Sequence, residues 1–280
     1  MIEVGQFNKL RVVKEKDAGL YLDGEELGEI LLPHRYVKKH YYRDDLIEVF
    51  LYFDSEDRII ATTDQPYGVV GDFVILQVVS VLEIGAFLDW GLTKDLFVPL
   101  REQKKPMRKG QYYIVYIFTD KKTGRLVASS KLDKFLQEDV TGFEEGQKVK
   151  LFLCDETDLG YKTIVNGVCW GLLYKNDVFQ EIFRGDFLDG YIKKVRDDGK
   201  LDVSLQPSGY GKIESFADII LKALQKNDNF LSLHDKTPAP IIKDRLGMSK
   251  KNFKKAIGGL YKRKLINLEK DGISLIVDKK

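Results

Sequence analysis

The sequence has little of the chemistry on which disulfide frameworks and zinc sites depend. Its 280 residues include two cysteines and three histidines. Cys154 and Cys169 are too far apart for a CxxC pair and too few for a disulfide framework, so we expect small apolar side chains in a reducing cytosol. There is no HExxH motif, close histidine pair or GxxxxGK[ST] phosphate loop. These absences favour a non-enzymatic protein with no metal and no cofactor.

Long apolar runs are also missing. No run approaches the ~20 residues that span a bilayer, and the N-terminal MIEVGQFNKL lacks the basic-then-apolar layout of a signal peptide. We therefore expect a cytoplasmic protein with no membrane partner. Apolar residues make up 44% and charged residues 31% of the chain. Its length predicts two to four compact units.

The net charge of +2 is unevenly distributed. Residues 213–280 contain 15 Lys and Arg against 8 Asp and Glu, a net charge of +7, whereas the rest of the chain carries −5. Attraction for a phosphate backbone would therefore be concentrated near the C-terminus. An ordinary lysine-rich surface gives the same count.

A pattern of glycine and proline occurs three times before residue 210. The second copy follows the first by 66 residues, and the third follows the second by 75. The corresponding positions are Gly5, Gly19 and Pro33; Gly71, Gly85 and Pro99; and Gly146, Gly160 and Tyr174. Each copy contains an opening strand, a strand after the inner glycine, a short apolar strand, and a hairpin around DSED, DKKTG or RDDG. This order predicts a five-stranded all-β unit of about 65 residues, a size that suits a closed barrel.

The last segment has a different pattern. IESFADIILKALQK has helical apolar spacing, PIIKDRLGMSKKNFKKAIGGLYKRKLI reads as helix–turn–helix, and NLEKDGISLIV reads as a hairpin. Gly247 ends the first helix of the pair and Ser249 caps the second. The order helix–strand–helix–helix–hairpin indicates a winged helix. Four lysines lie mostly off the apolar stripe of the second helix and are candidates for nucleic-acid contact: Lys250, Lys251, Lys254 and Lys255.

The three repeats resemble S1-type domains, the RNA-binding form of the OB fold. GAFL at 85–88, GLLY at 171–174 and GRLVASS at 124–130 carry the resemblance. Three such domains followed by a winged helix resemble the conserved virulence factor B family of bacterial RNA-binding regulators, over nearly the whole chain. The expected fold is multidomain and mainly β. Its predicted parts are S1-type OB barrels at 1–64, 65–131 and 145–210 and an α+β winged-helix domain at 213–280.

The resemblance implies an aromatic residue that stacks a base, two positions after the inner glycine. Tyr21 and Phe87 occupy this position in the first two copies, whereas the third has Lys162 there and Tyr161 one residue early. Tyr174 stands where the family commonly has a histidine, and could stack or hydrogen-bond. The alternative is that Tyr21 and Phe87 only cover the barrel surface, because aromatic residues on strands often serve packing.

The resemblance also implies a basic residue after the late hairpin turn. Arg58, Arg125 and Lys200 match it, and each could meet a phosphate or a base edge. Of the two tryptophans, Trp90 could be an exposed platform or a cap on the barrel end, and Trp170 is expected in packing.

Together these features predict a post-transcriptional regulator that binds single-stranded RNA with weak sequence selectivity, by base stacking and phosphate contacts, with help from the winged helix. Two alternatives stay open. One is a DNA-binding transcription regulator that acts through the winged helix. The other is a protein-interaction scaffold on the ribosome or polymerase, with vestigial OB faces; the net acidity of the first three quarters favours it.

Overall fold

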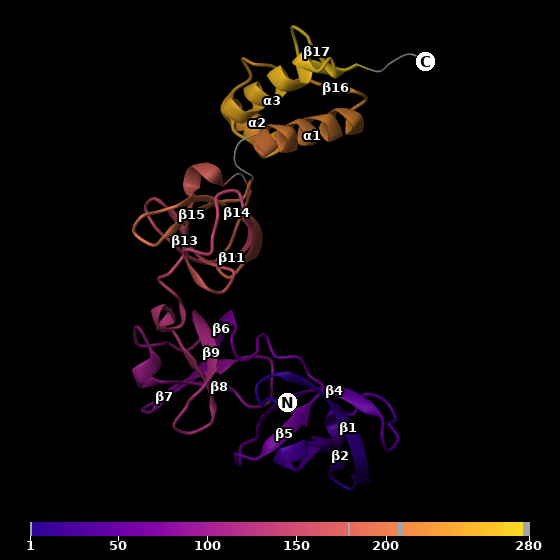
Figure 1. Ribbon diagram of the computed structural model, residues 1–280, viewed down its shortest axis with the longest axis vertical. Coiled ribbons are helices and arrows are strands. Elements are labelled where there is room, and N and C mark those ends of the chain that lie inside the picture. The colour runs from indigo at the N-terminus through magenta and orange to yellow at the C-terminus, as the bar shows by residue number, and fades with distance from the viewer. Residues whose placement is uncertain (1, 179, 207–209, 277–280) are drawn as a thin grey trace. The chain divides into compact units, whose positions relative to one another are not determined.

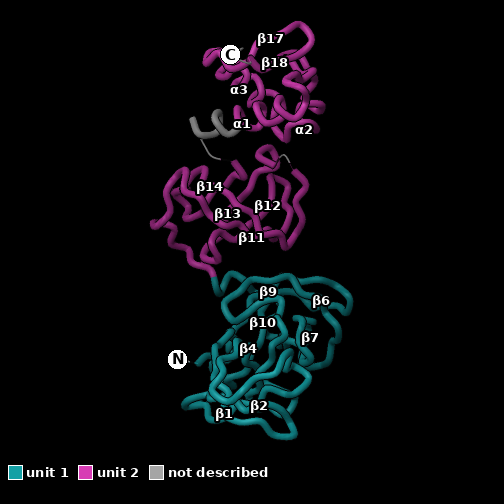
Figure 2. The backbone as a smooth tube through the Cα atoms, turned by 90° about the vertical axis from the view of Figure 1, so that its right-hand side faces the viewer, with its two compact units in different colours: residues 1–135 teal, residues 136–280 magenta. Residues whose placement is uncertain are grey.

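The computed structural model describes residues 2–178, 180–206 and 210–276. They form two compact units, residues 1–135 and 136–280 (Figure 2). The first unit contains two β-barrels, and the second contains a third barrel and the helical C-terminal domain (Figure 1).

Each barrel has five strands in the same closed order, in which the third and fifth strands pair in parallel. The first comprises β1 (Phe7–Lys16), β2 (Gly19–Asp23), β3 (Glu29–Pro33), β4 (Leu46–Phe53) and β5 (Ile59–Thr62). The second comprises β6 (Phe73–Leu82), β7 (Gly85–Asp89), β8 (Leu96–Pro99), β9 (Tyr112–Thr119) and β10 (Leu126–Ser129). The third comprises β11 (Lys148–Glu156), β12 (Gly160–Val165), β13 (Cys169–Tyr174), β14 (Phe187–Val195) and β15 (Leu201–Ser204). The predicted tandem of five-stranded barrels is confirmed.

Short 3-10 helices connect some of these strands. They are η1 (Glu25–Leu27), η2 (His34–Tyr36), η3 (Leu100–Glu102), η4 (Leu132–Phe135) and η5 (Lys175–Asp177). The last residue of η4 extends the second barrel, because the Phe135 ring stacks on Tyr116 of β9 at a centroid distance of 4.1 Å.

Close approach of two strands explains the repeated inner glycine. In each barrel this residue pairs with the last residue of the third strand, 14 positions later. A Cβ on Gly19, Gly85 or Gly160 would lie 2.1, 2.3 or 2.2 Å from a carbonyl oxygen of that strand. No side chain fits at such a distance, so the 14-residue spacing in the sequence results from a close contact between two strands of the barrel.

The first two barrels pack against each other through β4. Its residues Ile47, Val49 and Leu51 fill the first barrel's core, as strand alternation requires. Phe50 and Tyr52 face the other way, yet they are only 0% and 3% exposed, because they join the second barrel's core cluster. A strand buried on both faces therefore joins the two barrels into one body.

Trp90 lies in this contact. Its ring is 3% exposed and meets Phe50 edge-on at a centroid distance of 5.7 Å, and its Nε1 donates to the Lys94 carbonyl oxygen at 2.6 Å. The interpretation of Trp90 as an exposed platform is therefore wrong: the neighbouring barrel covers it. Polar contacts add to the packing, including a 2.8 Å hydrogen bond between the hydroxyls of Tyr36 and Thr93.

The C-terminal domain has the predicted order of elements. They are α1 (Tyr210–Lys226), β16 (Phe230–Leu231), α2 (Ala239–Leu246), α3 (Lys250–Lys262), β17 (Ile266–Leu268) and β18 (Ile273–Leu275), and the strands form a sheet in the order β16-β18-β17. Gly247 ends α2 in the left-handed conformation, at φ 62°. The Ser249 hydroxyl caps α3 by accepting from the Asn252 backbone N–H at 3.2 Å. The winged-helix prediction is confirmed.

Candidate nucleic-acid interface

The first barrel presents a tyrosine flanked by lysines. Tyr21 lies half-buried on the outward face of β2 and pairs with Lys14 of β1. The Nζ atoms of Lys14 and Lys16 lie 5.5 and 5.4 Å from the centre of its ring, within cation–π distance. Lys14 also forms an ion pair with Glu29 at 2.5 Å. One ring and two ammonium groups are thus held on one surface, which suits a base and its phosphate.

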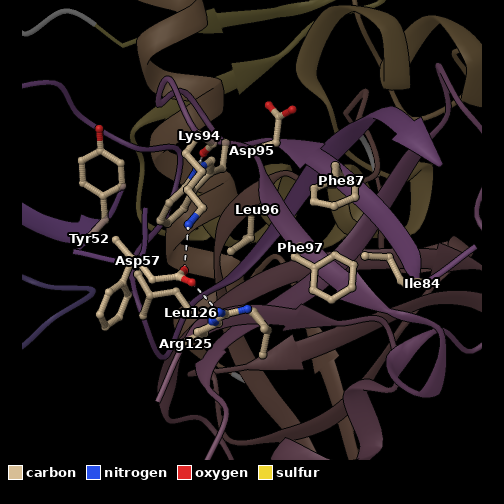
Figure 3. A pocket seen from close by; sticks show the side chains of 13 residues that line it. Tyr52, Asp57, Ile84, Phe87, Lys94, Asp95, Leu96, Phe97, Arg125 and Leu126 are labelled. Carbon is tan, nitrogen blue, oxygen red and sulfur yellow. Dashed lines mark hydrogen bonds and ion pairs between the residues drawn. The ribbon is translucent and has the colours of Figure 1, made fainter. Parts of the chain in front are cut away.

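The second barrel presents two rings. Phe87 of β7 is half-buried and lies directly opposite Phe97 of β8, with centroids 5.0 Å apart (Figure 3). Phe97 was not among the predicted site residues, although the alternation in DLFVP places it on the outward face two residues before Pro99. The two rings line a cleft of about 380 Å³, together with Ile84 and Leu96.

A charged cluster lies in the same cleft. The Asp57 carboxylate, from the first barrel, forms an ion pair with Arg125 and another with Lys94 at 3.5 Å, both from the second barrel (Figure 3). Lys94 Nζ also donates to the Asp54 carbonyl oxygen at 2.6 Å. Arg125, a predicted RNA contact, therefore has a carboxylate partner 68 residues away in the sequence.

The other two late-hairpin cations are also paired. Arg58 is 67% exposed, and its Nε and Nη2 donate to one oxygen of Asp54 at 2.9 and 2.8 Å. Burial works to raise the pKa of Asp54, but the hydrogen bonds from Arg58 outweigh it and hold that pKa below its usual range. Lys200 lies 3.4 Å from Asp198. A phosphate would have to compete with these carboxylates.

The third barrel has a different outward surface. Lys162 Nζ lies 3.5 Å from the centre of the Trp170 ring, which is half-buried on β13. Tyr174 donates its hydroxyl to Asp202 at 3.3 Å, and Lys193 lies 5.3 Å from its ring. Tyr161 packs partly against the core. Trp170 of the neighbouring strand therefore supplies the ring beside Lys162, although the sequence indicated only a packing role for it.

The lysines of α3 differ from the barrel cations. Lys251, Lys254 and Lys255 are exposed and share one helix face, opposite the buried stripe of the helix. Within the described part of the chain, no ion pair engages any of the three. Lys250 is half-buried and donates to the Lys236 carbonyl oxygen at 3.2 Å. Among the described residues of the winged helix, these three lysines therefore present positive charge that no ion pair offsets.

Metal sites and membrane-spanning helices are both missing from the described residues. No group of three or more His, Cys, Asp or Glu side chains there is arranged to hold a metal ion. None of the helices there combines the length and the apolar character needed to cross a bilayer.

Comparison with known proteins agrees with this architecture. Residues 4–64 and 70–131 match the S1 domain family, and residues 218–275 match the CvfB-like winged helix domain; the third barrel lies outside these ranges. The uncharacterized protein YitL of Bacillus subtilis is 27% identical over 92% of this chain and 89% of its own. Conserved virulence factor B of Staphylococcus aureus is 27% identical over 83% of this chain and 82% of its own.

A crystal structure of a multidomain protein with nucleic acid binding domains from Streptococcus pneumoniae aligns with 98% of each chain, at 24% identity and a TM-score of 0.41. The family matches fall on the first two barrels and the winged helix, in the order that the sequence predicted. The chain therefore combines S1 domains with a CvfB-like winged helix domain, and it is similar to conserved virulence factor B over most of its length.

Proposed function

We propose that this chain is a non-enzymatic post-transcriptional regulator that acts in the cytoplasm by binding single-stranded RNA. The observation that carries the proposal is the outward ring of Tyr21 between Lys14 and Lys16. A base stacks on the ring, and the ammonium groups attract its phosphates. Because every base has a flat face, this contact selects sequence weakly.

Two further surfaces add to the affinity. Phe87 and Phe97 offer a second stacking site in the same unit. The exposed lysines of α3 add electrostatic attraction, which is strong for nucleic acids at low salt. Weak sites on one chain reinforce one another through effective concentration, so a long strand binds more tightly than a short one. A phosphate can bind the late-hairpin cations only by replacing their carboxylate partners; these cations are Arg58, Arg125 and Lys200. In the third barrel the corresponding surface is formed by Lys162 and Tyr174.

A DNA-binding role is the second candidate, and the exposed lysines of α3, Lys251, Lys254 and Lys255, favour it. The helix carries no array of arginine, asparagine or glutamine that would read base edges in a major groove, and Asn252 is half-buried near its start. Contact with a nucleic-acid backbone suits this composition better than sequence-specific reading. Competition between duplex DNA and single-stranded RNA at fixed salt separates the two roles: a preference for duplex contradicts the proposal.

The stacking contact is tested by Tyr21→Ala and Phe87→Ala, singly and together. Each ring in contact with a base contributes ~1–3 kcal/mol, so we expect each substitution to weaken binding of a labelled oligouridine by about fivefold or more. Fluorescence anisotropy measures this affinity. Tyr42→Ala is the matched control, because Tyr42 is 70% exposed and lies outside the barrel strands. If the double variant binds as tightly as the parent chain, the proposal fails and the scaffold alternative gains support.

A further inference from the structure

The outward face of the β7–β8 hairpin combines the two rings with two carboxylates. Phe87 pairs with Phe97 and Leu88 with Leu96, and the same register continued by one position sets Asp89 opposite Asp95, the residue just before β8. Residues two apart on a strand point to the same side, about 7 Å from each other. Asp95 therefore lies beside the rings, and it lines the same cleft (Figure 3).

Asp95 differs from Asp89 in the hydrogen bonding of its side chain. The Asp89 carboxylate accepts a hydrogen bond from the Gly91 backbone N–H at 2.9 Å. No hydrogen bond or ion pair engages the Asp95 side chain among the residues that the structure describes. Burial raises the pKa of Asp95, and the charge of Asp89 raises it further. A half-buried carboxylate without a donor is poorly stabilised, so a ligand that brings donors would be favoured there.

The first barrel shows what is missing in the second. Sixty-six residues earlier, Glu29 and Asp23 occupy the positions of Asp95 and Asp89. Glu29 is paired with Lys14 at 2.5 Å, and Asp23 with Arg11 at 3.5 Å. In the second barrel, Ser80 replaces Lys14 and Gln77 replaces Arg11. The second copy thus has both carboxylates and neither cation.

We infer that the Asp95 carboxylate reads the edge of a base stacked on Phe87 and Phe97, and that it selects guanine. The inference rests on the proposed RNA-binding function. A carboxylate only accepts hydrogen bonds, so it favours a base edge with adjacent donors. Guanine presents two, N1–H and the 2-amino group. Adenine and cytosine place an acceptor beside their amino group, and uracil has a single N–H between two carbonyl oxygens.

The remaining lining of the cleft favours a base over the cationic side chain of a protein partner. Rings and a carboxylate together also suit arginine or lysine. Two cations, Lys94 and Arg125, already lie in this cleft and share the single carboxylate of Asp57, so their combined charge exceeds that of their partner and disfavours a further cation. A phosphate beside a bound guanosine could take the place of Asp57 at one of them.

The test uses the full chain and an oligouridine that carries one central guanosine, or inosine or adenosine in its place. Inosine lacks only the 2-amino group of guanosine. We expect the parent chain to prefer guanosine over inosine by about fivefold or more, which is at the lower end of the discrimination of paired hydrogen bonds. We expect Asp95→Asn to reduce this ratio to about one. Because the ratio is taken within each variant, a general change in electrostatic attraction cancels.

Asp89→Asn is the matched control, since it removes a neighbouring charge while the Asp95 carboxylate stays in place, and should leave the ratio as it is in the parent chain. No preference for guanosine in the parent chain overturns the inference, and so does a preference that survives Asp95→Asn. A third result also overturns it: an oligoarginine peptide binds the parent chain but not Asp95→Asn, while the guanosine-to-inosine ratio is the same for both. In each of these cases, RNA binding by the parent chain that Phe87→Ala weakens would leave the proposed function intact. If the parent chain binds no RNA at all, both the proposed function and the inference about Asp95 fail.

Discussion

Replacing Phe50 by alanine should weaken the contact between the first two barrels. Phe50 is fully buried, although it points away from its own barrel's core. Its ring lies 5.4 Å from Phe7, 6.4 Å from Tyr52 and 5.7 Å from Trp90, measured between ring centroids. Alanine would leave a cavity where the second barrel now packs, and the loss would affect both barrels.

The size of the effect follows from this burial. Phe→Ala substitutions at fully buried sites cost ~3–5 kcal/mol, including the cavity. Because Phe50 also contributes three aromatic contacts, we expect the free energy of unfolding of residues 1–135 to fall by about 4 kcal/mol. With a urea dependence of ~2 kcal/mol per molar, the unfolding midpoint falls by about 2 M.

Trp90 gives a local signal for this measurement. The chain has two tryptophans, so Trp170→Phe leaves Trp90 as the single tryptophan, inside the contact in question. Urea unfolding followed by Trp90 emission should show the midpoint shift between this background and the same background with Phe50→Ala. The emission of the folded variant should also move to longer wavelength, because water gains access to the Trp90 ring.

Phe183→Ala is the control, because Phe183 is 66% exposed and belongs to the other unit. It should shift the Trp90 midpoint by less than about 0.3 M, since exposed substitutions are usually within ±0.5 kcal/mol. If Phe50→Ala shifts the midpoint no more than this control, Phe50 does not hold the two barrels together and the prediction is refuted.

Two further predictions concern charge. Burial works to raise the pKa of Glu102, but hydrogen bonds from Lys134 and Ser129 outweigh it and lower that pKa. Glu102→Gln should therefore destabilise the first unit at neutral pH. The difference from the parent chain should begin to shrink as the pH falls below the ordinary glutamate pKa of about 4.3, and it should vanish below the lowered pKa of folded Glu102. A difference in thermal unfolding that persists at still lower pH contradicts this. Replacing the exposed α3 lysines by glutamine should weaken the salt dependence of RNA binding. The slope of log affinity against log salt concentration should fall in magnitude by up to ~0.7 for each phosphate that a lysine no longer neutralises. An unchanged slope shows that α3 does not contact the RNA strand. The three substituted lysines are Lys251, Lys254 and Lys255.

Patterns within a few residues of each other predicted the fold well. The 14-residue spacing from Gly19 to Pro33 recurs because two strands touch there, and neither residue depends on another domain. The Ser249 cap and the Gly247 stop are likewise local, and both are confirmed. The resemblance to S1 domains picked out Tyr21 and Phe87 by their distance from the inner glycine, and both side chains are half-buried on β2 and β7.

Contacts between distant residues were beyond such patterns. Nothing near Arg125 in the sequence indicates that Asp57 binds it, and the double-sided apolar pattern of β4 does not say what covers Phe50. Phe97 could have been found from alternation in its strand, but Trp170 beside Lys162 required the register of β12 against β13. Each of these depends on which surfaces meet after the strands have formed.

The sequence by itself determined the repeats, the barrels and the winged helix, because periodicity, turns and caps act over short distances along the chain. The tertiary structure decided which cations are neutralised, which rings are covered and which carboxylate has no ion-pair partner among the described residues. The physical reason is that packing and ion pairing depend on distance in space. Asp95 and Glu29 stand at equivalent places in two copies of one pattern, yet of the two only Glu29 forms an ion pair with a lysine among the described residues.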